Sequence, residues 1–163
     1  MIHKRLLSLA ALIMLFSFPV SASMVSFLIV ETGLSEETAY MPQTGLWEGG
    51  LMDAFFDAGH IVTNSPAARM QKKPAPDISG LVEEDYQDAV SGGADYFLLA
   101  FLEYQNRADR SIPVRITLKL YKTDSKKLIF EQNFPAGTGK DLDEEYKIAQ
   151  NAGRAIIPHL KDR

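Results

Sequence analysis

Cysteine is absent from this chain of 163 residues. Lipoproteins carry their lipid on a cysteine, so lipid anchoring of that kind is excluded. Disulfide bonds, a catalytic thiol and cysteine zinc sites are excluded for the same reason. With 46% hydrophobic residues, the chain must be stabilised by an ordinary hydrophobic core.

Basic charge is also scarce. Seventeen Lys and Arg residues stand against 21 Asp and Glu residues, and no basic run exceeds two residues. Proteins that bind nucleic acids neutralise phosphates with clustered Lys and Arg side chains. We therefore expect no nucleic-acid partner.

Complete catalytic motifs are missing as well. Ser65 lacks the Gly-x-Ser-x-Gly surroundings of a nucleophile elbow. Gly139-Lys140 resembles part of a phosphate-binding loop, but Phe134 stands where the motif needs glycine and Asp141 where it needs Ser or Thr. The pair Glu144-Glu145 points apart on a helix, which indicates solvated side chains. The sequence predicts no catalytic residue, metal ligand or cofactor, and favours a protein that is not an enzyme.

The first 22 residues have the pattern of a signal peptide. Lys4 and Arg5 precede the apolar run 6–18, and Val20-Ser21-Ala22 ends with the small residue that signal peptidase requires. The alternative is an uncleaved anchor, although the run is short for a span of about 20 residues. We expect cleavage after Ala22 and no membrane span afterwards. The remaining 141 residues (163 minus 22), 23–163, would form a single periplasmic or secreted domain.

The next segments alternate between strand and helix. The apolar run Met24–Val30 is typical of a strand covered on both faces. A helical apolar stripe follows over 44–58, Gly59 would end that helix, and 60–64 predicts a short strand. This order favours a right-handed crossover between two parallel strands.

The second half predicts a further helix, three strands and a final helix. The helices are expected over 80–91 and 142–159, and the strands over 96–104, 114–121 and 128–134. The segment 65–78, which has three prolines, predicts a long loop. The complete order β-α-β-α-β-β-β-α indicates an α/β fold of two or three layers, with a mixed sheet of about five strands and about three helices.

Residues 94–160 resemble a group of envelope domains. Gly93-Ala94-Asp95-Tyr96 opens a strand, and the two strands that follow are joined by the turn at Thr123–Lys127. This order is similar to the N-terminal α/β domain of the Tol-Pal protein TolB, to CsgG-like proteins and to the lipoprotein activators of penicillin-binding proteins. The resemblance implies an exported, non-catalytic envelope protein that binds or assembles with other proteins, and it carries over no catalytic residue. The sequence leaves the partner and the oligomeric state open.

One edge of the predicted sheet collects polar side chains. Parallel strands end at a common edge, where the crossover helix begins and where ligands bind in open α/β sheets. The residues expected there are Glu31, Thr32, Thr44, Trp47, Glu48, Asn64 and Ser65. A small-molecule binder or hydrolase that uses the edge around Glu31, Glu48 and Asn64 is therefore the alternative function. The competing interpretation is structural, with Trp47 in the core and the polar residues satisfying the backbone or facing water.

Overall fold

The computed structural model describes residues 22–34, 42–70, 80–106, 111–138 and 141–160. The expected signal peptide, apart from Ala22, lies outside the described residues, as do residues 71–78 of the predicted long loop. The strands are β1 (Met24–Thr32), β2 (Ile61–Asn64), β3 (Ala68–Met70), β4 (Tyr96–Asn106), β5 (Ser111–Lys122) and β6 (Leu128–Phe134). The helices are α2 (Pro42–Asp57), α3 (Glu83–Ser91) and α4 (Leu142–Ile156), with single 3-10 turns at Gly80–Val82 and Ile157–His159.

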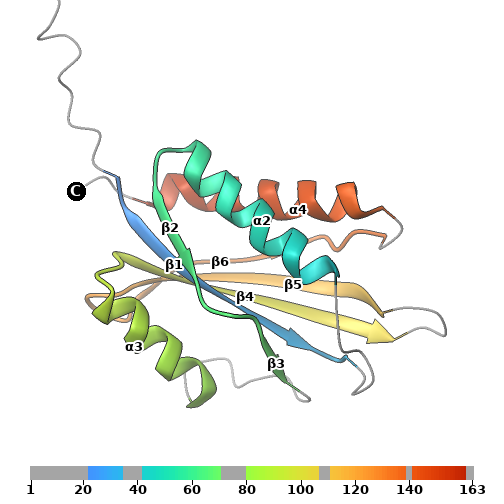
Figure 1. Ribbon diagram of the computed structural model, residues 1–163, viewed down its shortest axis with the longest axis horizontal. Coiled ribbons are helices and arrows are strands. Elements are labelled where there is room, and N and C mark those ends of the chain that lie inside the picture. Colours follow the sequence, from blue (N-terminus) through green and yellow to red (C-terminus); the bar gives the residue numbers. More distant parts are fainter. Residues whose placement is uncertain (1–21, 35–41, 71–79, 107–110, 139–140, 161–163) are drawn as a thin grey trace, which may run out of the picture.

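The strands form one mixed sheet in the order β2-β1-β4-β5-β6, and β3 pairs with β1 beyond the end of β2 (Figure 1). β1 runs parallel to β2, β3 and β4, whereas β5 is antiparallel to both β4 and β6. The predicted α/β fold with a mixed sheet is confirmed, and so is the parallel pairing across the first crossover. The sheet has six strands, because Ala68–Met70 forms a strand within the segment predicted as a loop.

The two faces of β1 are both covered, which accounts for its unbroken apolar sequence. Val25, Phe27 and Ile29 join the core beneath α2 and α4, and Leu28 and Val30 join the core beneath α3. Successive side chains of a strand alternate between faces, so an apolar residue is needed at every position of such a strand. Figure 1 shows the resulting three layers, with α2 and α4 on one side of the sheet and α3 on the other.

Helices α2 and α4 lie side by side (Figure 1) and approach each other through small residues. A Cβ atom added to Gly50 would lie 2.7 Å from the Cβ of Ala149 and 2.8 Å from the carbonyl oxygen of Tyr146. A Cβ on Gly153 would lie 2.7 Å from the Cβ of Ala54. Glycine at these two positions therefore permits the close contact that seals the core beneath both helices.

The Gly50→Ala variant is expected to unfold with a free energy lower by about 1–2 kcal/mol. Overpacking against the α4 backbone should outweigh the better helix propensity of alanine. Gly49→Ala is the matched control, because its Cβ would meet only the Tyr146 ring, at 3.7 Å; this change should be neutral or stabilising. Urea denaturation of both variants checks the prediction, and equal effects at the two positions would contradict it.

No helix in the described ranges is both long and apolar enough to cross a membrane.

Candidate functional site

Glu31 lies near the end of β1 and is fully buried. It follows Val25, Phe27 and Ile29 on alternate positions of the strand, so its side chain lies on the α2/α4 face of the sheet. A carboxylate in this position must be paired and hydrogen-bonded, because burial of an unpaired charge is costly.

Three partners from three elements surround this carboxylate. The Nε of Arg69, on β3, lies 3.0 Å from Glu31 Oε2 and forms an ion pair with it. The hydroxyl groups of Thr44 on α2 and Tyr104 on β4 donate to Glu31 Oε1, the second over 3.4 Å. The strand β3 places Arg69 directly beside Glu31 in the register of the sheet. Together these contacts tie the first turns of α2 and the strand β3 to the end of β1.

A second carboxylate, that of Glu145 on α4, is also fully buried. The indole N–H of Trp47 donates to Glu145 Oε2 over 3.3 Å, while Glu145 Oε1 has no hydrogen-bond partner among the described residues. A Cβ at Gly137 would lie 2.5 Å from that oxygen, so glycine lets the chain pass close to the carboxylate. The expectation that Glu144 and Glu145 are both solvated is wrong for Glu145. The two side chains do point apart, but only Glu144 points outward, where it accepts from the backbone N–H of Thr138 over 3.1 Å.

Both buried carboxylates affect the pKa of Tyr104. Burial raises the pKa of its phenol first, and the charges of Glu31 and Glu145 raise it further. The phenol therefore remains protonated and donates its hydrogen bond to Glu31 throughout the physiological pH range. Glu31, Tyr104, Trp47 and Glu145 form what we call the buried carboxylate cluster, with Thr44 and Arg69 at its margin.

The other predicted edge residues are separated from this cluster. Asn64 pairs in register with Phe27, four residues before Glu31 and about 13 Å from it along the strand. Its side-chain amide donates to Glu48 Oε1 over 3.4 Å on the surface. The backbone N–H of Ser65 donates to the carbonyl of Phe27 over 3.0 Å. The strand β2 thus ends halfway along β1, so the common rim expected for Glu31 and Asn64 does not form.

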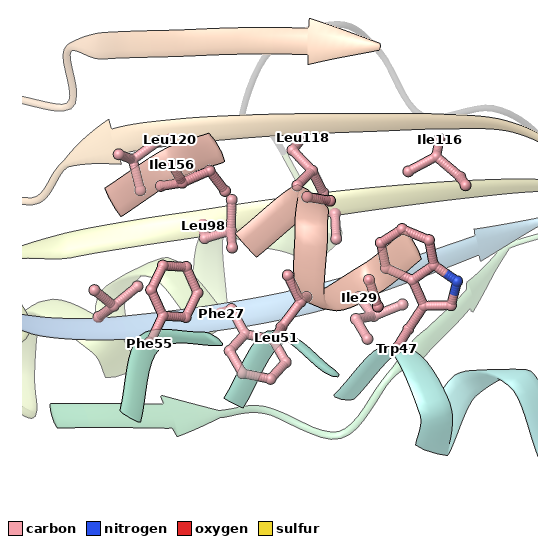
Figure 2. Packing of buried hydrophobic residues seen from close by; sticks show 14 of the residues in the cluster. Phe27, Ile29, Trp47, Leu51, Phe55, Leu98, Ile116, Leu118, Leu120 and Ile156 are labelled. Carbon is pink, nitrogen blue, oxygen red and sulfur yellow. The ribbon is translucent and has the colours of Figure 1, made fainter. Parts of the chain in front are cut away.

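Thr32 lies apart from the other predicted edge residues, and Trp47 lies in the core, which was the competing structural interpretation. Thr32 follows Glu31 directly and therefore lies on the opposite, α3 face of the sheet. Trp47 is fully buried, and Figure 2 shows its indole beside Ile29 in the core beneath α2 and α4. Of the seven predicted residues, the structure brings together Glu31 with Thr44 and Glu48 with Asn64, and it places Trp47 against Glu145.

Comparison with known proteins gives a family and a set of similar folds. A family model described as "Uncharacterised protein" matches residues 24–149. This chain belongs to that family. Comparison with the curated proteins gives no match.

Several solved structures resemble the chain. A PelC dodecamer from Paraburkholderia phytofirmans is 14% identical with a TM-score of 0.50, over 88% of this chain and 90% of that chain. TolB from Acinetobacter baumannii is 16% identical with a TM-score of 0.35, over 85% of this chain and 27% of that chain. The LpoB C-terminal domain from Escherichia coli is 17% identical with a TM-score of 0.34, over 79% of this chain and 93% of that chain. The resemblance to TolB and to this group of α/β domains, predicted from residues 94–160, is confirmed.

Three residues of the observed site were not predicted from the sequence, although a pattern in the sequence does indicate two of them. Tyr104 continues the alternation of Leu98, Ala100 and Leu102, all of which face α2 and α4. Glu145 precedes Ala149 by four residues and so extends the apolar stripe of α4 by one helical turn. Arg69 stands in a segment with no recognisable pattern, and only the pairing of β3 with β1 reveals its role.

The buried carboxyl of Glu145 predicts a dependence of stability on pH. Burial raises its pKa above the ordinary value, the Trp47 hydrogen bond lowers it, and the charge of Glu144 raises it, with burial the largest effect. The folded state therefore binds this proton more tightly than the unfolded chain, whose glutamates titrate near pH ~4.3. Its contribution to stability should be complete below that pH and be lost as the pH rises through the raised value.

Glu145→Gln is therefore expected to reduce the fall in unfolding free energy between about pH 4.3 and neutrality. Urea denaturation at a series of pH values measures this fall for the parent and the variant. Glu84→Gln, at an exposed position on α3, is the control and should leave the pH profile unchanged. Parallel profiles for the parent and Glu145→Gln would show that Glu145 does not cause the dependence.

Proposed function

We propose that this chain is an exported, non-catalytic protein of the cell envelope that acts as a binding or assembly module for other protein chains. The observation that carries the proposal is the fold shared with PelC over 88% of this chain, since the solved PelC structure is a dodecamer. A fold that forms an assembly in one protein is a reasonable scaffold for assembly in another, although its surface decides the partner.

The buried carboxylate cluster supports a non-catalytic role. Glu31 accepts hydrogen bonds from Thr44 and Tyr104 and pairs with Arg69, and Glu145 accepts from Trp47. The contacts of Glu31 hold α2 and β3 to the end of β1, and the contact of Trp47 with Glu145 joins α4 to α2. Partners are therefore expected to bind on the outer surface of the molecule, where exposed apolar side chains occur on several elements.

Export is the part of the proposal that the first 22 residues support. In a bacterial host, the protein recovered from the periplasm or the medium is expected to begin at Ser23, because Ala22 supplies the small residue before the cut. N-terminal sequencing of the recovered protein measures this. A variant with Leu12→Arg in the apolar run should remain in the cytoplasm with an uncut leader. A parent chain found only in the cytoplasm, starting at residue 1 or 2, would overturn export.

The binding role is tested by site-specific photocrosslinking in the intact envelope. A photoreactive amino acid at exposed Val114 or Phe56 is expected to give covalent adducts of defined mass, identified by mass spectrometry as envelope proteins or as further copies of this chain. The same amino acid at Leu98, which is fully buried, is the matched control. Failure of every exposed position to give adducts would contradict a binding or assembly role.

A further inference from the structure

The outermost strand β2 leaves part of its backbone unpaired. The N–H groups of Ile61 and Ser65 donate to the carbonyls of Ser23 and Phe27, each over 3.0 Å. Backbone groups alternate in direction along a strand, so those of Val62 and Asn64 point away from β1. Within the described part of the chain no strand pairs with β2 on that side. An unpaired strand edge of this kind is a template for another chain.

The other outermost strand, β6, runs in the same direction as β2. β2 is parallel to β1 and β4, and β6 is related to β4 by two antiparallel pairings. The register places Thr63, Ser26, Phe97, Tyr121 and Leu128 in one row across the sheet. The two free edges thus begin at the same end of the sheet, and a copy displaced sideways along this row would set its β2 parallel to β6.

Exposed apolar side chains mark that end on both edges. Ile61, at the start of β2, is 54% exposed, and Phe56, five residues earlier in the last turn of α2, is 74% exposed. Leu128, at the start of β6, is 40% exposed. Single exposed hydrophobic residues are ordinary. Their position at the same end of the two opposite edges would let them meet if β2 of one copy lay beside β6 of another.

Charge distinguishes the two edges. Asp57, the exposed last residue of α2, precedes Ile61 by four residues, whereas the exposed Lys126 and Lys127 immediately precede Leu128. Lys126 pairs with Glu83 over 2.6 Å, while Lys127 extends the basic character of the turn toward β6. A contact between unlike edges therefore brings acidic and basic residues together.

We propose that copies of this chain associate head to tail, with the edge of β2 and Phe56 on one copy lying against the start of β6 on the next. Such a heterologous contact repeats from copy to copy and closes into a ring if the rotation permits. The inference rests on the assembly role proposed above and names its partner, a second copy of the same chain, and its two surfaces. It also accords with the likeness to PelC, whose solved structure is a dodecamer.

The first test compares oligomeric state by sedimentation velocity over a range of concentrations, using protein that begins at Ser23. The parent is expected to form species larger than a monomer. Ile61→Lys on β2 and Leu128→Glu on β6 should each give monomers, because each sets a charge against a like charge on the facing edge. Val114→Lys, which changes a side chain of similar exposure on the inner strand β5, should keep the assembly.

Mixing the two edge variants tests the head-to-tail arrangement. Each variant retains one intact edge, so an equimolar mixture should form heterodimers, and the new Lys and Glu on the remaining edges, opposite in charge, should let these heterodimers grow. A twofold contact through β2 predicts no heterodimer and would overturn the arrangement. A monomeric parent at all concentrations would overturn the inference as well, but adducts with other envelope proteins in the crosslinking experiment would leave the proposed function standing.

A second design keeps the inference testable if an edge variant fails to fold. Because the chain has no cysteine, Thr63→Cys together with Leu128→Cys supplies a single thiol on each edge. Mild oxidation should give covalent multimers of the double variant longer than dimers, and each single variant should give dimers at most. Oxidised double variant that stays monomeric or stops at dimers would contradict a head-to-tail contact.

Discussion

Replacing Trp47 with alanine is expected to lower the free energy of unfolding by about 3–5 kcal/mol. The side chain is fully buried in the core beneath α2 and α4, so its removal leaves a large cavity between the helices and β1. The change also removes the N–H that bonds Glu145 Oε2, and Glu145 Oε1 already has no partner among the described residues. A buried carboxyl without any hydrogen bond adds to the loss.

Trp47→Phe separates these two contributions, because it keeps most of the buried ring and removes only the N–H. The phenylalanine variant should lose less stability than the alanine variant and should show a stronger dependence on pH, since the carboxyl of Glu145 loses the bond that lowers its pKa. Trp47 is the only tryptophan in the chain, so unfolding must be followed by circular dichroism. Leu142→Ala, at an exposed position at the start of α4, is the control. A loss below about 1 kcal/mol in Trp47→Ala would show that the indole is not part of the core.

Elements with a strong local pattern could be predicted from the sequence. The unbroken apolar run of β1, the helical stripe of α2 and the alternation in β5 each specify both an element and the face that it buries. Their order then restricts the topology, since a strand-helix-strand unit has one favoured handedness. Pro158 marks the end of the last helix, where α4 gives way to a 3-10 turn three residues before the predicted limit at residue 159.

The strand β3 could not be predicted in this way. Ala68–Met70 is only three residues long, too short for an alternating pattern to stand out, and it has no β-branched residue. Its strand conformation is fixed by pairing with Val30–Thr32 and by the ion pair of Arg69 with Glu31. Such pairing depends on residues nearly forty positions apart, so it cannot be predicted from the local sequence.

The predicted edge divides into two parts because strand length decides where a strand ends relative to its neighbour. Parallel pairing of β1 and β2 is correct, but β2 stops opposite Phe27 and leaves the last residues of β1 to β3. Asn64 and Glu31 therefore lie on parallel strands, but Asn64 lies opposite Phe27, well before the end of β1 where Glu31 lies. Of the polar residues that do meet Glu31, Thr44 on α2 was among the predicted edge residues. The other two come from β3 and from the far part of β4, and one of them, Tyr104, is recognisable only once the buried face of β4 is known.

Arg69→Met is expected to lower the free energy of unfolding by about 3 kcal/mol, because it leaves the fully buried carboxylate of Glu31 without its counter-charge. The hydrogen bonds from Thr44 and Tyr104 remain but carry no net charge. Urea denaturation measures the loss. Lys122→Met is the matched control, since Lys122 and Asp124 are both exposed and 3.8 Å apart, and removal of such a pair should cost less than about 1 kcal/mol.

The double variant Glu31→Gln with Arg69→Met tests whether Glu31 stabilises the fold through its ion pair with Arg69. Glutamine keeps an oxygen for the hydroxyl groups of Thr44 and Tyr104 and needs no counter-charge, so the double variant should lose less stability than the sum of the two single losses, by about 0.5–3 kcal/mol. This coupling is expected if the carboxylate serves to hold β3 and α2 on the sheet. Additive losses would contradict this role and would show that Glu31 and Arg69 do not stabilise the fold as a pair.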